Sequence, residues 1–116
     1  MKNFLAIYLG TPAAIADWNG LPEAVQSERR AAGIKAWLEW GDRKRSRIVE
    51  MGAPLGKTKR VSKAGVADVR NAMTGFTIVS AESHEEAAKL FVNHPHFTVL
   101  PGDAVEIMEC LPIPDN

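Results

Sequence analysis

Two histidines, His94 and His96, flank a proline near the carboxyl end of this 116-residue chain and are its most suggestive reactive pair. An imidazole with a pKa near neutrality can accept or donate a proton, and two imidazoles can divide these roles. With His94 on the inner face of a helix and His96 in an extended segment after it, both rings could reach one pocket mouth as catalytic residues. In the alternative interpretation, His94 caps the carboxyl end of the helix and His96 is a solvated loop residue.

Two further groups of side chains are candidates for binding a ligand. Trp37 and Trp40 could stack a planar molecule, although aromatic residues at helical spacing more often belong to a core. Four cations in one loop could hold an anionic small molecule, or they could form only a solvated charged surface. These cations are Lys57, Lys59, Arg60 and Lys63.

Other chemistries are disfavoured by spacing. For a metal site, the histidine pair would need further ligands, and His84, Glu109 and Cys110 are the only nearby candidates in type. His84 lies at the opposite end of the expected helix, about 15 Å away at 1.5 Å per residue. The segment Gly56–Thr58 imitates a phosphate-binding loop but lacks the glycine that must stand five positions earlier. We therefore expect neither a metal nor another cofactor.

The elements that must position the histidines are encoded between Thr74 and Phe97. Apolar residues predict a strand over Phe76–Ala81. Ser83 and Glu86 have the spacing of a capping box, which predicts that a helix begins after Ser83. Pro95 should end that helix.

The rest of the chain supplies three more strands and one more helix. Strands are predicted over Asn3–Leu9, Arg47–Met51 and Ala104–Leu111, each bounded by glycine or proline. A long helix should begin at Pro22 and end near Gly41. The intervening segment 52–75 is interpreted either as an irregular hairpin or as a mobile flap.

This order, βαββαβ, predicts one α+β domain over residues 1–116 with a ferredoxin-like fold. Two helices would cover one face of a four-stranded antiparallel sheet. The strands Asn3–Leu9 and Phe76–Ala81 are apolar on both faces, so the second face needs a cover as well. A second copy of the chain is the expected cover, which predicts a homodimer.

Composition narrows the possible partners and compartment. Lysine plus arginine equals aspartate plus glutamate at 14 each, so no net charge draws the whole molecule to nucleic acid or to an anionic membrane. No apolar run approaches the roughly 20 residues of a membrane span. The single cysteine cannot form an internal disulfide, which fits a cytoplasmic protein. The apolar amino terminus also imitates a signal peptide, but glycine and proline interrupt it after six residues.

A family resemblance rests on the second half of the chain. A strand followed by Ala81-Glu82-Ser83, an alanine-rich helix, His94-Pro95 and the closing run Glu106–Pro112 resembles the YCII-related family. The resemblance implies a dimeric α/β-barrel fold and a family whose members mostly lack an assigned activity. Short members use a histidine on the first helix with an aspartate after it. This chain has no histidine there, so that dyad is not carried over.

The expected function follows from the histidines and the resemblance together. We expect cofactor-independent proton transfer or elimination on a small anionic or aromatic metabolite. His94 or His96 would be the base, a tryptophan would form a wall, and a loop lysine would hold an anion. The alternative is a non-catalytic module that binds a small ligand in the same cavity.

Overall fold

The computed structural model describes residues 1–114, and a four-stranded antiparallel sheet forms its centre. β1 (Lys2–Leu9) and β5 (Met73–Ala81) lie in the middle of the sheet, with β2 (Ile48–Glu50) and β6 (Ala104–Glu109) at its edges. Across the sheet from the β6 edge, the strands follow one another as β6, β1, β5 and β2. When the four strands are numbered along the chain, this order is 4-1-3-2. That is the strand order of a ferredoxin-like α+β fold, so the predicted fold class is confirmed.

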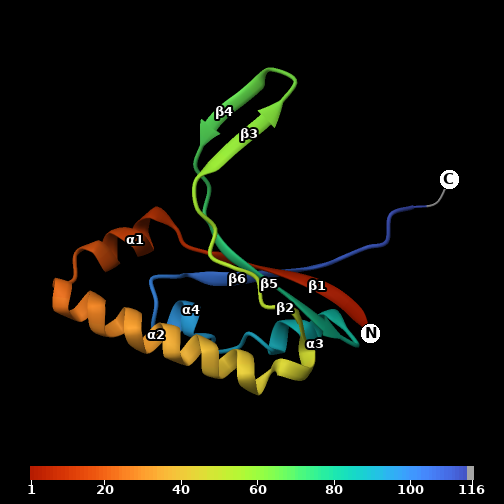
Figure 1. Cartoon of the computed structure of the whole chain (residues 1–116), viewed down its shortest axis with the longest axis horizontal. Helices are drawn as coiled ribbons and strands as arrows, with labels where there is room; N and C mark the ends of the chain where they lie inside the picture. Colours follow the sequence, from red (N-terminus) through yellow and green to blue (C-terminus); the bar gives the residue numbers. More distant parts are fainter. Residues whose placement is uncertain (115–116) are drawn as a thin grey trace.

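The helices gather on one face of the sheet, but there are more of them than expected (Figure 1). They are α1 (Pro12–Asn19), α2 (Glu23–Arg43), α3 (His84–Lys89) and α4 (Pro95–Thr98), and a 3₁₀ turn, η1 (Arg45–Arg47), follows α2. The expectation of two helices was therefore wrong. Thr11 and Pro12, expected only to stop the first strand, also start α1, because the Thr11 hydroxyl accepts the Ala14 amide at 3.3 Å and proline suits the first helical turn.

The second helical region contains a confirmed start and a corrected end. Ser83 caps α3 by accepting the Glu86 amide at 3.1 Å, as the capping box predicts. The helix ends at Lys89, and Pro95 begins α4 instead of ending α3. Asn93, with a φ of 58°, turns the chain between them. The fixed φ of proline suits a first helical position, so His96 lies in a helix and not in the extended segment that we expected.

The core lies between the sheet and the helices. Every second side chain of each central strand points into it. On β1, Phe4, Ala6 and Tyr8 are buried, whereas their neighbours are only half-buried. On β5, Val79 belongs to this buried face and Ile78 to the opposite one. Among the described residues, no helix covers the opposite face. Its apolar residues are Leu5, Ile7, Leu9, Phe76, Ile78 and Met108.

The uncertain segment 52–75 contains a β-hairpin, which we call the arm. The arm consists of β3 (Thr58–Ser62) and β4 (Gly65–Val69), which pair only with each other. It projects away from the helices (Figure 1). The radius of gyration, 16.1 Å, exceeds the roughly 13 Å expected of a compact chain of this length, and the projecting arm explains part of the excess.

None of the helices in residues 1–114 has the length and apolar character that crossing a membrane requires.

Candidate functional site

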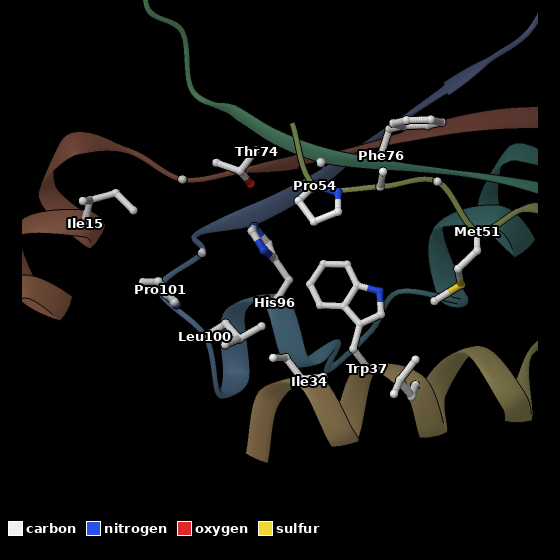
Figure 2. Close-up of a pocket in the computed structure, with 16 residues that line it drawn as sticks. Ile15, Ile34, Trp37, Met51, Pro54, Thr74, Phe76, His96, Leu100 and Pro101 are labelled. Atoms are coloured by element: carbon white, nitrogen blue, oxygen red, sulfur yellow. The ribbon is translucent and has the colours of Figure 1, made fainter. Parts of the chain in front are cut away.

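A pocket of about 560 Å³ opens between the helices and one end of the sheet, within the usual size range of small-ligand sites. Its walls come from α1, α2, α4, the ends of β1 and β5, and the segments that follow β2 and α4 (Figure 2). Most of the lining is apolar. The lining residues are Gly10, Ile15, Ile34, Trp37, Leu38, Met51, Gly52, Ala53, Pro54, Thr74, Gly75, Phe76, His96, Leu100, Pro101 and Gly102.

His96 is the titratable side chain of this lining, and its ring is held in one orientation. Its Nε2 lies 2.7 Å from the carbonyl oxygen of Leu9. A carbonyl only accepts hydrogen bonds, so Nε2 carries the proton and Nδ1 of the neutral ring has a free lone pair. Gly102 packs flat against the imidazole, and a Cβ at that position would overlap with the ring. Glycine at 102 therefore allows the ring to lie where it does.

Nδ1 of His96 is accessible to a ligand. Nδ1 has no partner at hydrogen-bonding geometry in residues 1–114, although the Ala104 backbone lies near the ring and raises its pKa. Only one buried side-chain polar atom in that range lacks a partner, and it belongs to His94. The unbonded Nδ1 of His96 is therefore not closed off from solvent. Burial is the main cause that lowers the pKa of His96, which keeps the ring neutral and able to accept a proton near pH 7.

Asp103 lies beside this histidine and opposes the effect of burial on its pKa. The Asp103 amide donates to the Leu9 carbonyl at 3.0 Å, the same oxygen that accepts from His96. Its carboxylate accepts the Thr11 amide at 2.5 Å, and hydrogen bonds from Thr11 are the main reason that the pKa of Asp103 is lowered. The resulting negative charge raises the pKa of His96. Asp103 can thus stabilise an imidazolium once His96 has accepted a proton.

This arrangement predicts the effect of removing the Asp103 charge. Asp103→Asn keeps an oxygen that can accept the Thr11 amide, so the loop should stay in place. Without the carboxylate, the pKa of His96 is expected to fall further, because less negative charge stabilises the protonated ring. Proton NMR titration of the imidazoles measures the shift. Glu106→Gln, which removes an exposed charge on the strand that follows Asp103, should leave the His96 titration unchanged, and an unchanged value in Asp103→Asn would contradict the prediction.

His94 lies next to His96 but is closed off from the pocket. Its side chain is completely buried. It contacts the rings of Trp37 and Trp40 at centroid distances of 4.6 and 4.5 Å. Its Nδ1 accepts the His96 amide at 2.9 Å, so His94 caps the amino end of α4 and not the carboxyl end of the preceding helix. Burial lowers its pKa to about 3, and the neighbouring His96 adds to the effect.

The two tryptophans have different surroundings. Trp37 lines the pocket, and its indole N–H has no hydrogen-bond partner in residues 1–114, yet it is not among the buried atoms. In Figure 2 its ring stands beside His96. Trp40 is buried in the core, where its indole N–H donates to the Leu90 carbonyl at 2.9 Å. A ligand in the pocket can therefore contact Trp37 and cannot reach Trp40 without a rearrangement of the core.

Tyr8 packs against both histidines and Trp37, but it is not available as an acid. The Thr77 hydroxyl donates to the Met51 carbonyl at 2.8 Å, so the Tyr8 hydroxyl must donate to Thr77, 2.7 Å away. Burial raises the pKa of Tyr8 to about 12. The Tyr8 proton is thus held in a hydrogen bond to Thr77 within the core.

The basic side chains expected to hold an anion lie on the arm or at its base. None of them lines the pocket. Lys59 forms an ion pair with Asp68 on the neighbouring strand, with a distance of 2.6 Å between Nζ and Oδ1. Lys57, Arg60 and Lys63 are exposed. Anion binding by these cations stays a prediction. In this structure such an anion would bind outside the pocket.

Sequence reasoning missed Asp103 and Thr11, although a signal for them was present. In a βαββαβ fold the first and last strands pair, and the two strands are antiparallel here. The residues after β1 and before β6 must then meet at one end of the sheet, beside the loop that carries His96. The polar residues at these two strand ends were therefore foreseeable neighbours of the histidine.

Comparisons with known proteins support the fold alone. A scan against models of protein families finds no match, and a search of curated proteins finds no similar sequence. A search of solved structures finds 5-chloro-2-hydroxyhydroquinone dehydrochlorinase from Burkholderia phenoliruptrix AC1100, in complex with 2,5-dihydroxybenzoquinone. The match covers 90% of this chain and 89% of that chain, with 20% sequence identity and a TM-score of 0.53. The chain therefore shares the α+β fold of that enzyme.

Proposed function

We propose that the protein catalyses a cofactor-independent proton transfer or elimination on a small aromatic metabolite. The observation that carries this proposal is the free Nδ1 of His96 at an apolar pocket lined by Trp37. A neutral imidazole held by one nitrogen and open at the other has the geometry of a general base. The structural neighbour, a dehydrochlorinase solved with a quinone, adds support at the level of the fold.

In the proposed reaction, Nδ1 of His96 removes a proton from an O–H or C–H group of the substrate. The electron pair left behind forms a new double bond, and in an elimination the leaving group departs with its own electron pair. The imidazolium that results is stabilised by the negative charge of Asp103, which is a positioning residue in this proposal. The imidazolium then returns its proton to product or to water.

The test is a panel of small hydroxyaromatic compounds, with and without a chlorine substituent. Chloride release and deuterium incorporation from solvent report elimination and proton transfer. His96→Gln should reduce either rate by about a hundredfold or more, the usual contribution of a general base. Arg60→Gln on the arm serves as the matched control and should keep the wild-type rate, because Arg60 does not line the pocket. Equal rates in His96→Gln and wild type would rule out the proposed base.

A non-catalytic module that binds a small ligand is the second candidate. It is favoured by the small number of polar side chains in the lining, where Thr74 and Trp37 join His96. The two candidates differ in one measurement. A module would bind members of the panel without exchanging protons or releasing chloride.

We also propose that the protein is a homodimer in which a second copy covers the open face of the sheet. The apolar residues on that face include Leu5, Ile7 and Ile78, and none of the helices within residues 1–114 lies over them. Apolar surface of this extent is usually an interface. Two copies packed through this face would form the barrel that the family resemblance implies.

A further inference from the structure

We propose that the pocket selects an uncharged aromatic ring with a free hydroxyl group, and that it rejects aromatic carboxylates of the same shape. The inference deepens the proposed function, because it concerns the same pocket, but it can hold even where no reaction occurs. Three features carry it: the charges near the pocket, the state of the amide groups in its wall, and the polar atoms that are left free.

No lysine or arginine lines the pocket in the part of the chain that the structure describes. Of the four charged residues next to lining residues in the sequence, Lys35 and Glu39 are exposed on α2, and the other two are carboxylates. Glu50 accepts the amide of the lining residue Gly52 at 3.1 Å, and Asp103 directly follows the lining residue Gly102. A carboxylate ligand would therefore lose its water in an apolar cavity without gaining a cation, and it would meet negative charge nearby.

Three of the four glycine amides in the wall cannot compensate for the missing cation, because they already have partners. The Gly10 amide donates to the Ala72 carbonyl at 2.9 Å, and the Gly102 amide donates to the His96 carbonyl at 2.9 Å. The Gly52 amide is bonded to Glu50. Gly52 itself is fixed by its positive φ of 80° and by close contact with the Phe76 carbonyl, so its amide is not easily turned inward. These glycines therefore form no anion-binding nest.

The polar atoms that remain free match a neutral hydroxyaromatic molecule. Nδ1 of His96 is an acceptor for a hydroxyl proton. The indole N–H of Trp37 is a donor for an uncharged oxygen, and the Trp37 ring stands nearly perpendicular to the imidazole, 6.0 Å away between centroids. The Thr74 hydroxyl donates to the Tyr8 carbonyl at 3.1 Å and can still accept. One acceptor for a hydroxyl, one donor for an oxygen and an aromatic wall define the ligand class.

The test compares three compounds of similar size: 4-hydroxybenzamide, 4-hydroxybenzoate and benzamide. The first is neutral with a hydroxyl, the second differs from it in charge, and the third lacks the hydroxyl. Binding to the 116-residue chain at pH 7 is followed by the indole N–H signals in nitrogen-15 NMR spectra. The Trp37 signal should shift on binding, whereas the signal of Trp18, which does not line the pocket, should not.

We expect 4-hydroxybenzoate to bind roughly tenfold more weakly than 4-hydroxybenzamide, because an unpaired charge is costly in an apolar site. Benzamide should bind about threefold more weakly or worse, for the loss of one hydrogen bond. His96→Gln keeps an N–H for the Leu9 carbonyl but lacks the Nδ1 acceptor, so it should remove the preference for the hydroxyl. Trp37→Phe keeps an aromatic wall and should weaken both amides equally.

Two results would overturn the inference: benzoate binding as tight as amide binding, or no shift of the Trp37 signal with any of the three compounds at millimolar concentration. Arg60→Gln combined with Lys59→Gln identifies the cause of the first result, because loss of benzoate binding would show that the arm supplies a cation. Selective binding of the amide without proton exchange or elimination in the compound panel would instead reject the proposed reaction and leave the selectivity intact.

Discussion

Lysine in place of Val79 is expected to unfold the protein, whereas lysine in place of its neighbour Ile78 is expected to leave the fold intact and to split the proposed dimer. Val79 is completely buried between the sheet and the helices. Ile78 points to the open face and pairs with Leu5 of β1 on that face. A lysine ammonium buried at 79 without a partner costs several kcal/mol, which is comparable to the whole stability of a small domain.

The two variants are matched controls for each other, because the same substitution at adjacent positions differs only in the face that it reaches. Circular dichroism with thermal melting measures the fold, and sedimentation at micromolar concentration measures the oligomeric state. Ile78→Val keeps the apolar face and should sediment like wild type. A wild-type protein that sediments as a monomer would end the dimer proposal. A folded Val79→Lys variant would contradict the assignment of the two faces.

The alternation of the central strands could be predicted from the sequence, but which face meets the helices could not. Phe4, Ala6 and Tyr8 share one face with period two, and their neighbours are equally apolar. With both faces apolar, the pattern contains no polar side that would mark the solvent. The structure decides the question, since the helices cover Val79 and leave Ile78 open.

The start of α3 was predictable because a capping box is local, whereas its end depended on tertiary contacts. Ser83 and Glu86 stand three residues apart and need no other part of the chain. The end at Lys89 and the new start at Pro95 depend on Phe91 and His94, which pack into the aromatic core beside Trp40. Proline is common both in the first turn of a helix and just after the end of a helix, and the sequence alone does not choose between these two positions.

The site, like α3, was predicted only in part, because some of its features are local and others depend on tertiary contacts. His96 could be selected by residue type, but its separation from His94 follows from the cap on α4, which turns one ring into the core and the other to the pocket. The basic segment was visible as a cluster in the sequence. That it forms a projecting hairpin, with Val61 opposite Val66 and the cations away from the pocket, depends on strand pairing.

The stability of the protein is expected to fall steeply as the pH drops below about 6.5, and His94 is the main cause. Burial lowers the folded pKa of His94 to about 3 from its ordinary value of 6.5. Below pH 6.5 the unfolded chain binds a proton at this residue and the folded protein does not, so protonation favours unfolding. The stabilising contribution is complete above the unfolded pKa and is lost as the pH falls toward the folded one, by about 1.4 kcal/mol for each pH unit. The lowered pKa of His96 acts in the same direction.

Two features of the His94 environment argue for this sign against the attraction between a cation and aromatic rings. Its Nδ1 already accepts the His96 amide, so a proton there would set two donors against each other and break the cap on α4. Its Nε2 is buried without a hydrogen-bond partner in residues 1–114. The rings of Trp37 and Trp40 could return about 2 kcal/mol through cation–π contact, whereas burying an unpaired charge costs more.

Urea unfolding between pH 4 and pH 8 measures this dependence, and His94→Asn isolates the contribution of His94. Asparagine can accept the His96 amide with its side-chain oxygen but does not titrate, so the cap is kept while the proton-binding group is removed. The variant should be less stable than wild type at pH 8, because a smaller side chain leaves a cavity in the aromatic core. Its stability should nevertheless fall less steeply toward pH 4, so that the difference from wild type narrows. His84→Gln changes an exposed histidine and should keep the steep acid limb. Parallel pH profiles for His94→Asn and wild type would show that His94 is protonated at no cost in the folded protein, and that its cage of aromatic rings accepts a cation after all.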